Sequence, residues 1–184
     1  WDKCGKYLKT VQDVEPNYYN PSNWVTALTP LGENFFLSGS RSGKINLWAN
    51  NGDFVREIIV PTPKKRDKFT QKQNHTRINC LLQGSKPGGE NFFIGFPTMF
   101  QEFNFKYNTT VTKTHVHKRD WVWDMASVGE DYLALICGTS VQLWKNREDE
   151  GWNIQSNIET KKKRGYPRPF LTSLGLIEDN KKCY

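Results

Sequence analysis

Basic side chains gather in three short segments of this 184-residue chain, and the chemistry open to them is the binding of negative charge. The segments are residues 61–77, 115–120 and 159–169, with the cations Lys64, Lys65, Arg66, Lys68, Lys118, Arg119, Lys161, Lys162, Lys163, Arg164 and Arg168. Together they carry more positive charge than the net +7 of the whole chain, so the remainder is net negative. A charge run is commonly just a solvated loop, but three on one face would focus a positive potential.

The cysteines and histidines form no metal or catalytic pattern. Cys4, Cys80, Cys137 and Cys183 include no CxxC pair and keep no metal-ligand spacing with the three histidines. No phosphate-cradling loop and no G-x-S-x-G nucleophile motif occurs. Cys80 and Cys137 lie in apolar runs, where a thiol behaves as a small hydrophobe, which indicates reduced core cysteines of an intracellular protein. We therefore expect no cofactor, no metal site and no enzyme activity.

The composition indicates a folded chain in spite of its low hydrophobic content. Only 36% of the residues are hydrophobic, but 14% are aromatic, and disordered chains are poor in aromatics. No apolar run reaches the roughly 20 residues of a transmembrane helix, so we expect no membrane span.

Short strands are the elements that must position the basic segments. Runs of four to seven residues rich in Val, Ile, Leu, Phe and Trp alternate with clusters of Gly, Asn, Asp and Pro, and no convincing amphipathic helix appears. This pattern predicts an all-β fold. Asn51-Gly52 predicts a two-residue hairpin turn with positive φ at both central residues.

The strands recur as units of four. The complete units cover residues 24–60, 78–114 and 121–158, and the basic segments separate them. Residues 1–12 match the end of a preceding unit, 13–23 a linker loop, and 170–184 the start of a further unit. Four-stranded units repeating every 40–50 residues, roughly, are typical of propeller blades. A sandwich of unrelated strands would not explain why Gly39, Gly95 and Gly138 all end a second strand.

The first and third units resemble blades of the WD-repeat β-propeller family. The resemblance rests on Leu37–Trp48, on the shortened copy Cys137–Trp144, and on the dipeptide Trp1-Asp2. It implies a β-propeller of four-stranded antiparallel blades, with about three whole blades plus partial blades at each end. The turns between second and third strands lack the Asp that family blades often hydrogen-bond to a His, which marks a divergent member.

The tryptophans divide into two groups by position. Trp48 and Trp144 end third strands at matching places, which favours packing between blades. Trp24 and Trp121 stand at the start of first strands beside a loop, where core packing and partner contact both stay open, because Trp is enriched in binding hot spots.

Three blades do not close a ring, since propellers have about four to eight. An open arc would expose apolar blade faces and strand edges. We expect a fragment of a larger ring, seven-bladed by family resemblance, whose remaining blades come from missing sequence or from another chain.

The resemblance implies a non-catalytic scaffold for protein–protein interactions within a larger complex. The basic segments add a basic face for an acidic partner, such as an acidic or phosphorylated segment. The alternative is a subunit of an RNA-processing or ribosome-assembly complex that contacts RNA through the same loops. Two of the basic runs also resemble nuclear-import signals. We therefore expect an intracellular protein, nuclear or cytoplasmic.

Overall fold

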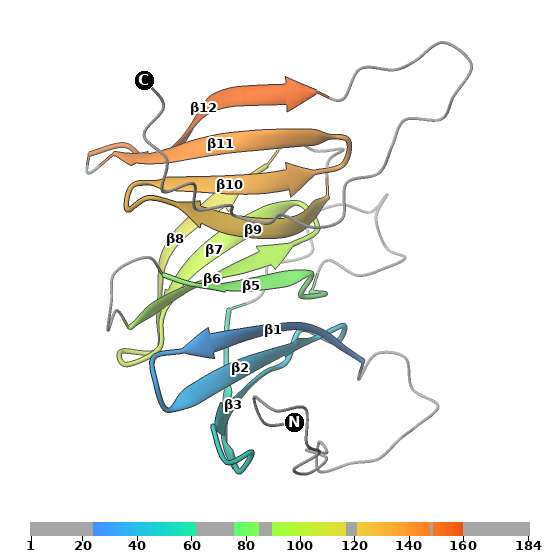
Figure 1. Ribbon diagram of the computed structural model, residues 1–184, viewed down its shortest axis with the longest axis vertical. Coiled ribbons are helices and arrows are strands. Elements are labelled where there is room, and N and C mark those ends of the chain that lie inside the picture. Colours follow the sequence, from blue (N-terminus) through green and yellow to red (C-terminus); the bar gives the residue numbers. More distant parts are fainter. Residues whose placement is uncertain (1–23, 62–75, 85–89, 117–120, 148, 160–184) are drawn as a thin grey trace, which may run out of the picture.

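Three antiparallel four-stranded sheets make up the part of the chain that the computed structural model describes, residues 24–61, 76–84, 90–116, 121–147 and 149–159 (Figure 1). This confirms the predicted all-β class and the four-stranded antiparallel blades. The partial blades predicted at residues 1–12 and 170–184 lie outside the described residues.

Each sheet is formed by four strands that are consecutive in the chain. The first sheet contains β1 (Val25–Leu31), β2 (Phe35–Ser40), β3 (Ile45–Ala49) and β4 (Phe54–Ile58). The second contains β5 (Cys80–Gln83), β6 (Asn91–Phe96), β7 (Met99–Asn104) and β8 (Thr109–His115). The third contains β9 (Val122–Val128), β10 (Tyr132–Cys137), β11 (Ser140–Arg147) and β12 (Gly151–Glu159).

The turn at Asn51-Gly52 differs from the prediction. Only Gly52 has a positive φ, of 83°, so the two-residue turn with positive φ at both residues is wrong. The Gly52 amide donates to the Ala49 carbonyl at 2.7 Å, and the Ala49 amide donates to the Asp53 carbonyl at 2.9 Å. The result is a longer turn that closes on the glycine. The Asn51 side chain takes part instead, because its Oδ1 accepts the Asp53 amide at 3.0 Å.

Two hydrophobic clusters join the three sheets. The first interface, between the first and second sheets, includes Leu37, Leu47, Phe96 and Phe103. The second interface, between the second and third sheets, is filled by the residues Cys80, Phe93, Phe100, Val116, Val122, Met125, Leu133, Leu135, Cys137 and Trp144. The inner strands β1, β5 and β9 of successive sheets lie side by side across these interfaces (Figure 1).

Glycines let the inner strands approach so closely. A Cβ on Gly39 would stand 2.6 Å from Ile78 Cγ2, and a Cβ on Gly95 would meet the sulfur of Cys80 and stand 3.2 Å from Val122 Cγ1. Gly138 lies differently, in the turn after β10 with φ 61°. The structural counterpart of Gly39 and Gly95 in the third sheet is Ile136, which pairs with Val141 three residues before Trp144.

Trp48 and Trp144 occupy matching positions of β3 and β11 but contact different neighbours. Trp144 contacts Phe100 of the second sheet, with ring centroids 5.5 Å apart, and its counterpart Phe103 faces the first sheet. Trp48 packs on Phe36 and Phe54 of its own sheet and belongs to neither interface cluster. Its indole N–H donates to Ser38 Oγ at 2.8 Å.

Candidate functional site

The first strands of the three sheets, β1, β5 and β9, start at one end of the stacked sheets, on the right in Figure 1. The turns between second and third strands lie at the same end. We call this end the loop rim and define it as residues 24, 41–44, 76–79, 97–98, 121 and 138–139. The opposite end holds the other hairpin turns, and we call it the hairpin rim, residues 32–34, 50–53, 90, 105–108, 129–131 and 149–150. The loop rim is the candidate site, because the predicted basic segments begin or end at it.

Trp24 and Trp121 have the same backbone role on the loop rim. The Trp24 carbonyl accepts the Arg41 amide at 2.9 Å, and the Trp121 carbonyl accepts the Gly138 amide at 3.1 Å. Both residues are thus fixed to the neighbouring turn while their side chains stay 60% and 37% exposed. The Trp121 ring lies against the Trp123 ring with centroids 5.3 Å apart. Neither ring belongs to the two hydrophobic clusters, and both lie at the surface of the described residues.

Backbone hydrogen bonds join one sheet to the next along this rim. The Ile78 amide donates to the Ser40 carbonyl at 3.1 Å, and the Val122 amide donates to the Pro97 carbonyl at 3.2 Å. The rim is therefore a continuous backbone platform across the three sheets rather than a set of separate loops.

Serine hydroxyls organise the first turn, which lacks the Asp that many WD-repeat blades have there. Ser40 Oγ lies 2.8 Å from Ser42 Oγ and accepts the Lys44 amide at 3.1 Å. Gly43 has φ 91°, and a Cβ there would stand 2.6 Å from the Thr76 carbonyl oxygen. The turn is thereby held against the chain that enters the second sheet.

The two rims differ in charge. The loop rim carries Arg41, Lys44 and Arg77, with Glu159 at the end of β12 on the same side. None of the three cations forms an ion pair with another described residue, and the Nε of Arg77 is buried without a hydrogen-bond partner among them.

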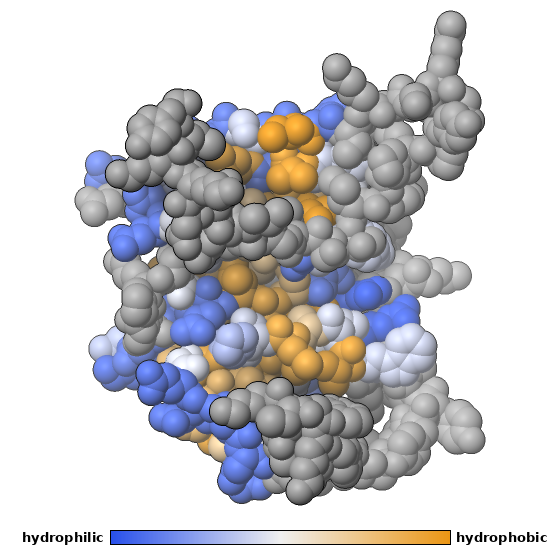
Figure 2. Space-filling model, viewed as in Figure 1, coloured by the Kyte–Doolittle hydropathy of each residue, from blue (hydrophilic) through white to orange (hydrophobic). Residues whose placement is uncertain are grey.

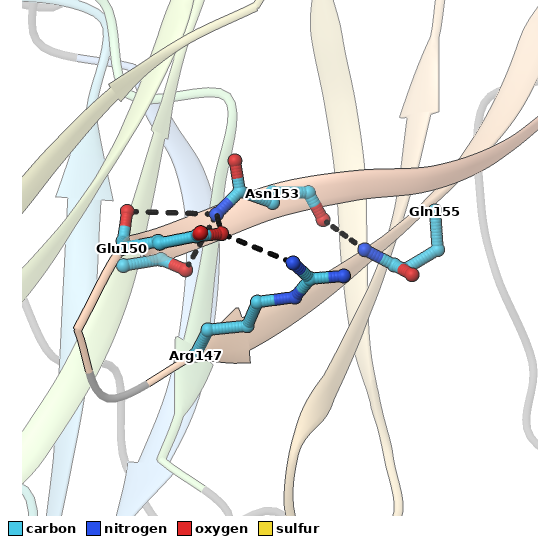
Figure 3. A network of polar contacts seen from close by, with 5 residues as sticks. Arg147, Glu150, Asn153 and Gln155 are labelled. Carbon is cyan, nitrogen blue, oxygen red and sulfur yellow. Dashed lines mark hydrogen bonds and ion pairs between the residues drawn. The ribbon is translucent and has the colours of Figure 1, made fainter.

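The hairpin rim is acidic. Its carboxylates are Glu33, Asp53, Glu90, Glu130, Asp131, Asp149 and Glu150. Lys106 of this rim pairs with Glu90 at 2.9 Å, and Arg147, at the end of β11 beside the rim, pairs with Glu150 at 3.1 Å. Figure 3 shows the second pair, which Asn153 joins by a 3.4 Å hydrogen bond to the same carboxylate. Carboxylates therefore outnumber cations among the described residues of this end.

All eleven cations singled out from the sequence lie outside the described residues. These are Lys64, Lys65, Arg66, Lys68, Lys118, Arg119, Lys161, Lys162, Lys163, Arg164 and Arg168. The sequence located the turn that holds Arg41 and Lys44 but did not assign those cations to the site. The signal that would have added them is the position of the turn, on the same end as the basic segments.

The described residues include no group of three or more His, Cys, Asp or Glu that could hold a metal ion. No helix long and apolar enough to cross a membrane occurs among them. Cys80 and Cys137 are buried and form no disulfide among the described residues, as expected for reduced core cysteines. Burial is the main reason that the pKa of the Cys80 thiol lies well above its usual value, with Asp124 and Cys137 adding to the effect, so Cys80 stays a neutral thiol.

No family model and no curated protein matches the sequence. Solved structures match the fold. Those of U3-55K and of the RRP9 WD40 repeats are each 15% identical over 74% of this chain, with TM-scores of 0.56 and 0.55. The WD40 β-propeller domain of Doa1 is also 15% identical over 74% of the chain, with a TM-score of 0.54.

The chain spans only part of these structures, covering 39% of U3-55K, 38% of the RRP9 repeats and 40% of the Doa1 domain. A sequence identity of 15% indicates a shared fold and nothing more specific. Three consecutive four-stranded antiparallel sheets, stacked through their inner strands, match the blades of those domains. This chain therefore has the fold of WD40-repeat β-propeller blades.

Proposed function

We propose that this chain is part of a non-catalytic WD40-type scaffold that binds an acidic or phosphorylated protein segment on its loop rim. The observation that carries the proposal is the opposite charge of the two rims. Arg41, Lys44 and Arg77 have no ion pair with a described residue at one end, whereas Lys106 and Arg147 at the other end are each paired with a glutamate. The predicted basic segments would add to the same end. The positive charge of the loop rim would attract an acidic segment and so steer it to this end.

The experiment compares charge reversal at the two ends. A fluorescein-labelled peptide with alternating glutamate and phosphoserine serves as the probe, and binding is followed by fluorescence anisotropy at low and high salt. We expect R41E/K44E and a reversal of Lys161–Arg164 each to weaken binding by about tenfold or more, and high salt to weaken it further. K145E on β11 is the matched control and should bind as the parent does. Equal binding by the rim variants and the control would contradict the proposal.

RNA is the second candidate partner, and the exposed Trp121 ring, which lies against the partly buried Trp123 ring, favours it. Rings exposed beside cations can stack on unpaired bases, and each stacked base contributes about 1–3 kcal/mol. We expect W121A to weaken binding of a twelve-nucleotide oligouridine more than binding of the phosphopeptide. Equal loss for both probes would favour the protein partner. Nuclease treatment of a pull-down separates the two in cells, because only RNA-dependent partners are lost.

The remaining blades are part of the same proposal. Val141 and Leu143 of the third sheet lie on the side turned away from the second interface, and both are partly exposed. Figure 2 shows hydrophobic surface over the third sheet and over the middle of the molecule, with hydrophilic residues around both. An apolar side of this kind suits a following blade, supplied by further sequence or by another chain. The buried thiols of Cys80 and Cys137, which form no disulfide among the described residues, fit the proposed intracellular location, nuclear or cytoplasmic.

A further inference from the structure

A groove borders the outermost strand of the second sheet. It has a volume of about 540 Å³ and is lined by Pro61, Asn108 and five residues of β8, Thr109–Lys113. Pro61 follows the outer strand of the first sheet, and its carbonyl accepts the side-chain N–H of Gln101 at 3.4 Å. The groove therefore has β8 along one side and the chain leaving the first sheet as its wall.

The free edge of β8 offers backbone hydrogen bonds to this groove. In the strand order β5-β6-β7-β8, β8 is the last strand and pairs only with β7. Half of the amides and carbonyls of an edge strand point away from its single neighbour. No backbone hydrogen bond from residues 109–115 to a described residue other than those of β7 is present. A strand of seven residues is about 24 Å long, which is enough to pair with an extended segment of five to seven residues, roughly.

Two side chains along the groove are left without partners. The hydroxyl oxygens of Thr110 and Thr112 are buried, and neither has a hydrogen-bond partner among the described residues. A buried polar atom without a partner costs free energy, about 1–3 kcal/mol. Both threonines are among the residues that line the groove, so this edge of the sheet has polar groups that its own fold leaves unsatisfied among the described residues.

Charge defines the kind of segment that fits. Residues 105–116 contain Lys106 and Lys113 and no carboxylate. Lys106 is paired with Glu90, so Lys113 is the cation of the groove that has no ion pair with a described residue. An extended segment with glutamates at alternate positions would place a carboxylate near Lys113 while its backbone pairs with β8.

We propose that the groove along β8 is a second binding site, distinct from the loop rim, at which an extended acidic peptide segment adds to the second sheet as a fifth strand. The affinity comes mainly from backbone hydrogen bonds to the free edge of β8, and Lys113 supplies the preference for acidic segments. This site does not depend on the proposed function, because it uses neither the loop rim nor its cations.

Backbone N-methylation gives the decisive test. The probe is the labelled heptapeptide Thr-Glu-Val-Glu-Val-Thr-Glu with blocked ends, measured by anisotropy against the whole chain. Its counterpart carries N-methyl groups on alternate residues along one edge, and a second counterpart carries them along the other edge. We expect one methylated peptide to bind at least about tenfold more weakly than the parent and the other to bind nearly as well, because only one edge of an added strand faces β8. Equal binding of all three peptides, or no binding of the parent, would overturn the proposal.

Charge reversal separates this site from the loop rim. We expect K113E to weaken binding of the heptapeptide by about threefold to tenfold and to leave the phosphopeptide unchanged, since an exposed ion pair is worth up to about 1 kcal/mol. K44E is the matched control, because it makes the same change on the loop rim, and it should leave the heptapeptide unchanged. If Lys113 served only to prevent edge-to-edge pairing with other chains, K113E would have no effect on binding of the heptapeptide. Hydrogen exchange adds a direct readout, because amides of β8 should become protected when the heptapeptide binds.

Discussion

Aliphatic side chains and phenylalanine fill the first interface between sheets, whereas tryptophan and cysteine contribute to the second. Trp144 and Trp152 of the third sheet meet Phe100 and Phe93 edge-to-face, with ring centroids 5.5 Å and 5.4 Å apart. The first interface has its tilted aromatic pair within one sheet, between Phe92 and Phe103. Edge-to-face pairs add about 0.5–1.5 kcal/mol beyond the burial of their area.

The backbone arrangement is nevertheless the same at both interfaces. Gly39 and Gly95 allow the next inner strand to approach. Thr26 Oγ1 donates to the Ile78 carbonyl, and in the next sheet Asn79 Nδ2 donates to the Val122 carbonyl at 2.6 Å. The difference teaches that stacking of these blades depends on a few backbone positions, while several sets of side chains can fill the space between them.

The largest effect should come from the aromatic side chains. We expect W144A to lower the free energy of unfolding by about 4 kcal/mol and F103A by about 3 kcal/mol, because both leave cavities and only Trp144 also loses an edge-to-face contact between sheets. Urea denaturation measures both. W24A is the control, since the exposed Trp24 should change stability by less than about 0.5 kcal/mol. A larger loss for F103A would show that the aromatic contacts do not distinguish the second interface.

The glycines should give the next largest effect. We expect G95A and G39A each to cost about 1–3 kcal/mol, since the added methyl group overlaps Cys80 in one interface and Ile78 in the other. The double variant G95A/C80A tests the cause, because removal of the sulfur should return part of the loss. Additive losses in the double variant would mean that the sulfur is not what the new methyl group meets.

The side-chain bonds to the next inner strand should contribute less. We expect T26V to cost about 1 kcal/mol, the usual contribution of one hydrogen bond. N79A should cost less than T26V, because it also removes an Oδ1 atom that is buried without a partner. N79D should cost more than N79A, since it places a carboxylate against the Val122 carbonyl oxygen in a buried site, where the two oxygens repel and the charge is desolvated. Urea denaturation of the three variants gives the order, and a smaller loss for N79D than for N79A would contradict it.

The smallest effect is confined to alkaline pH. The pKa of the Cys80 thiol is raised in the folded state, mainly by burial, so the folded protein holds this proton above the pH at which the unfolded chain loses it. Its contribution to stability is complete below the ordinary thiol pKa and is lost as the pH rises above about 9. We expect stability to fall more steeply with pH above that point in the parent than in C80A. Parallel curves would show that Cys80 does not titrate differently in the two states.

The fold class could be predicted from the sequence because the same strand pattern recurs, so each copy supports the assignment of the others. The runs ending at Trp48 and Trp144 share one pattern, with a weaker copy between them, and the structure confirms an all-β chain of four-stranded antiparallel blades. Turn geometry could not be predicted as well. Asn51 was expected to adopt a positive φ, but its side chain bonds to Asp53 and only Gly52 takes that conformation. Gly138 has the same place as Gly39 in the sequence pattern. In the structure, however, Gly39 pairs with Ile45 inside the sheet, whereas Gly138 lies in the turn after β10.

The candidate site could be predicted only in outline. Trp24 and Trp121 were identified at strand starts, but their exposure depends on which side of the sheet the ring leaves, and sequence position does not determine that. Arg41, Lys44 and Arg77 join the site because three strand ends meet at one end of the stacked sheets. The groove along β8 has no sequence signal, since it depends on where Pro61 passes the free edge of another sheet.

Local patterns in the sequence determined the strands, their grouping in fours and the excess of positive charge over the net-negative remainder, because strand periodicity and charge are properties of neighbouring residues. The tertiary structure alone decided which residues face one another across the interfaces, that cations and carboxylates separate to opposite rims, and that β8 keeps a free edge beside a groove. These features arise between residues far apart in the chain, and only the stacking of the sheets brings them together.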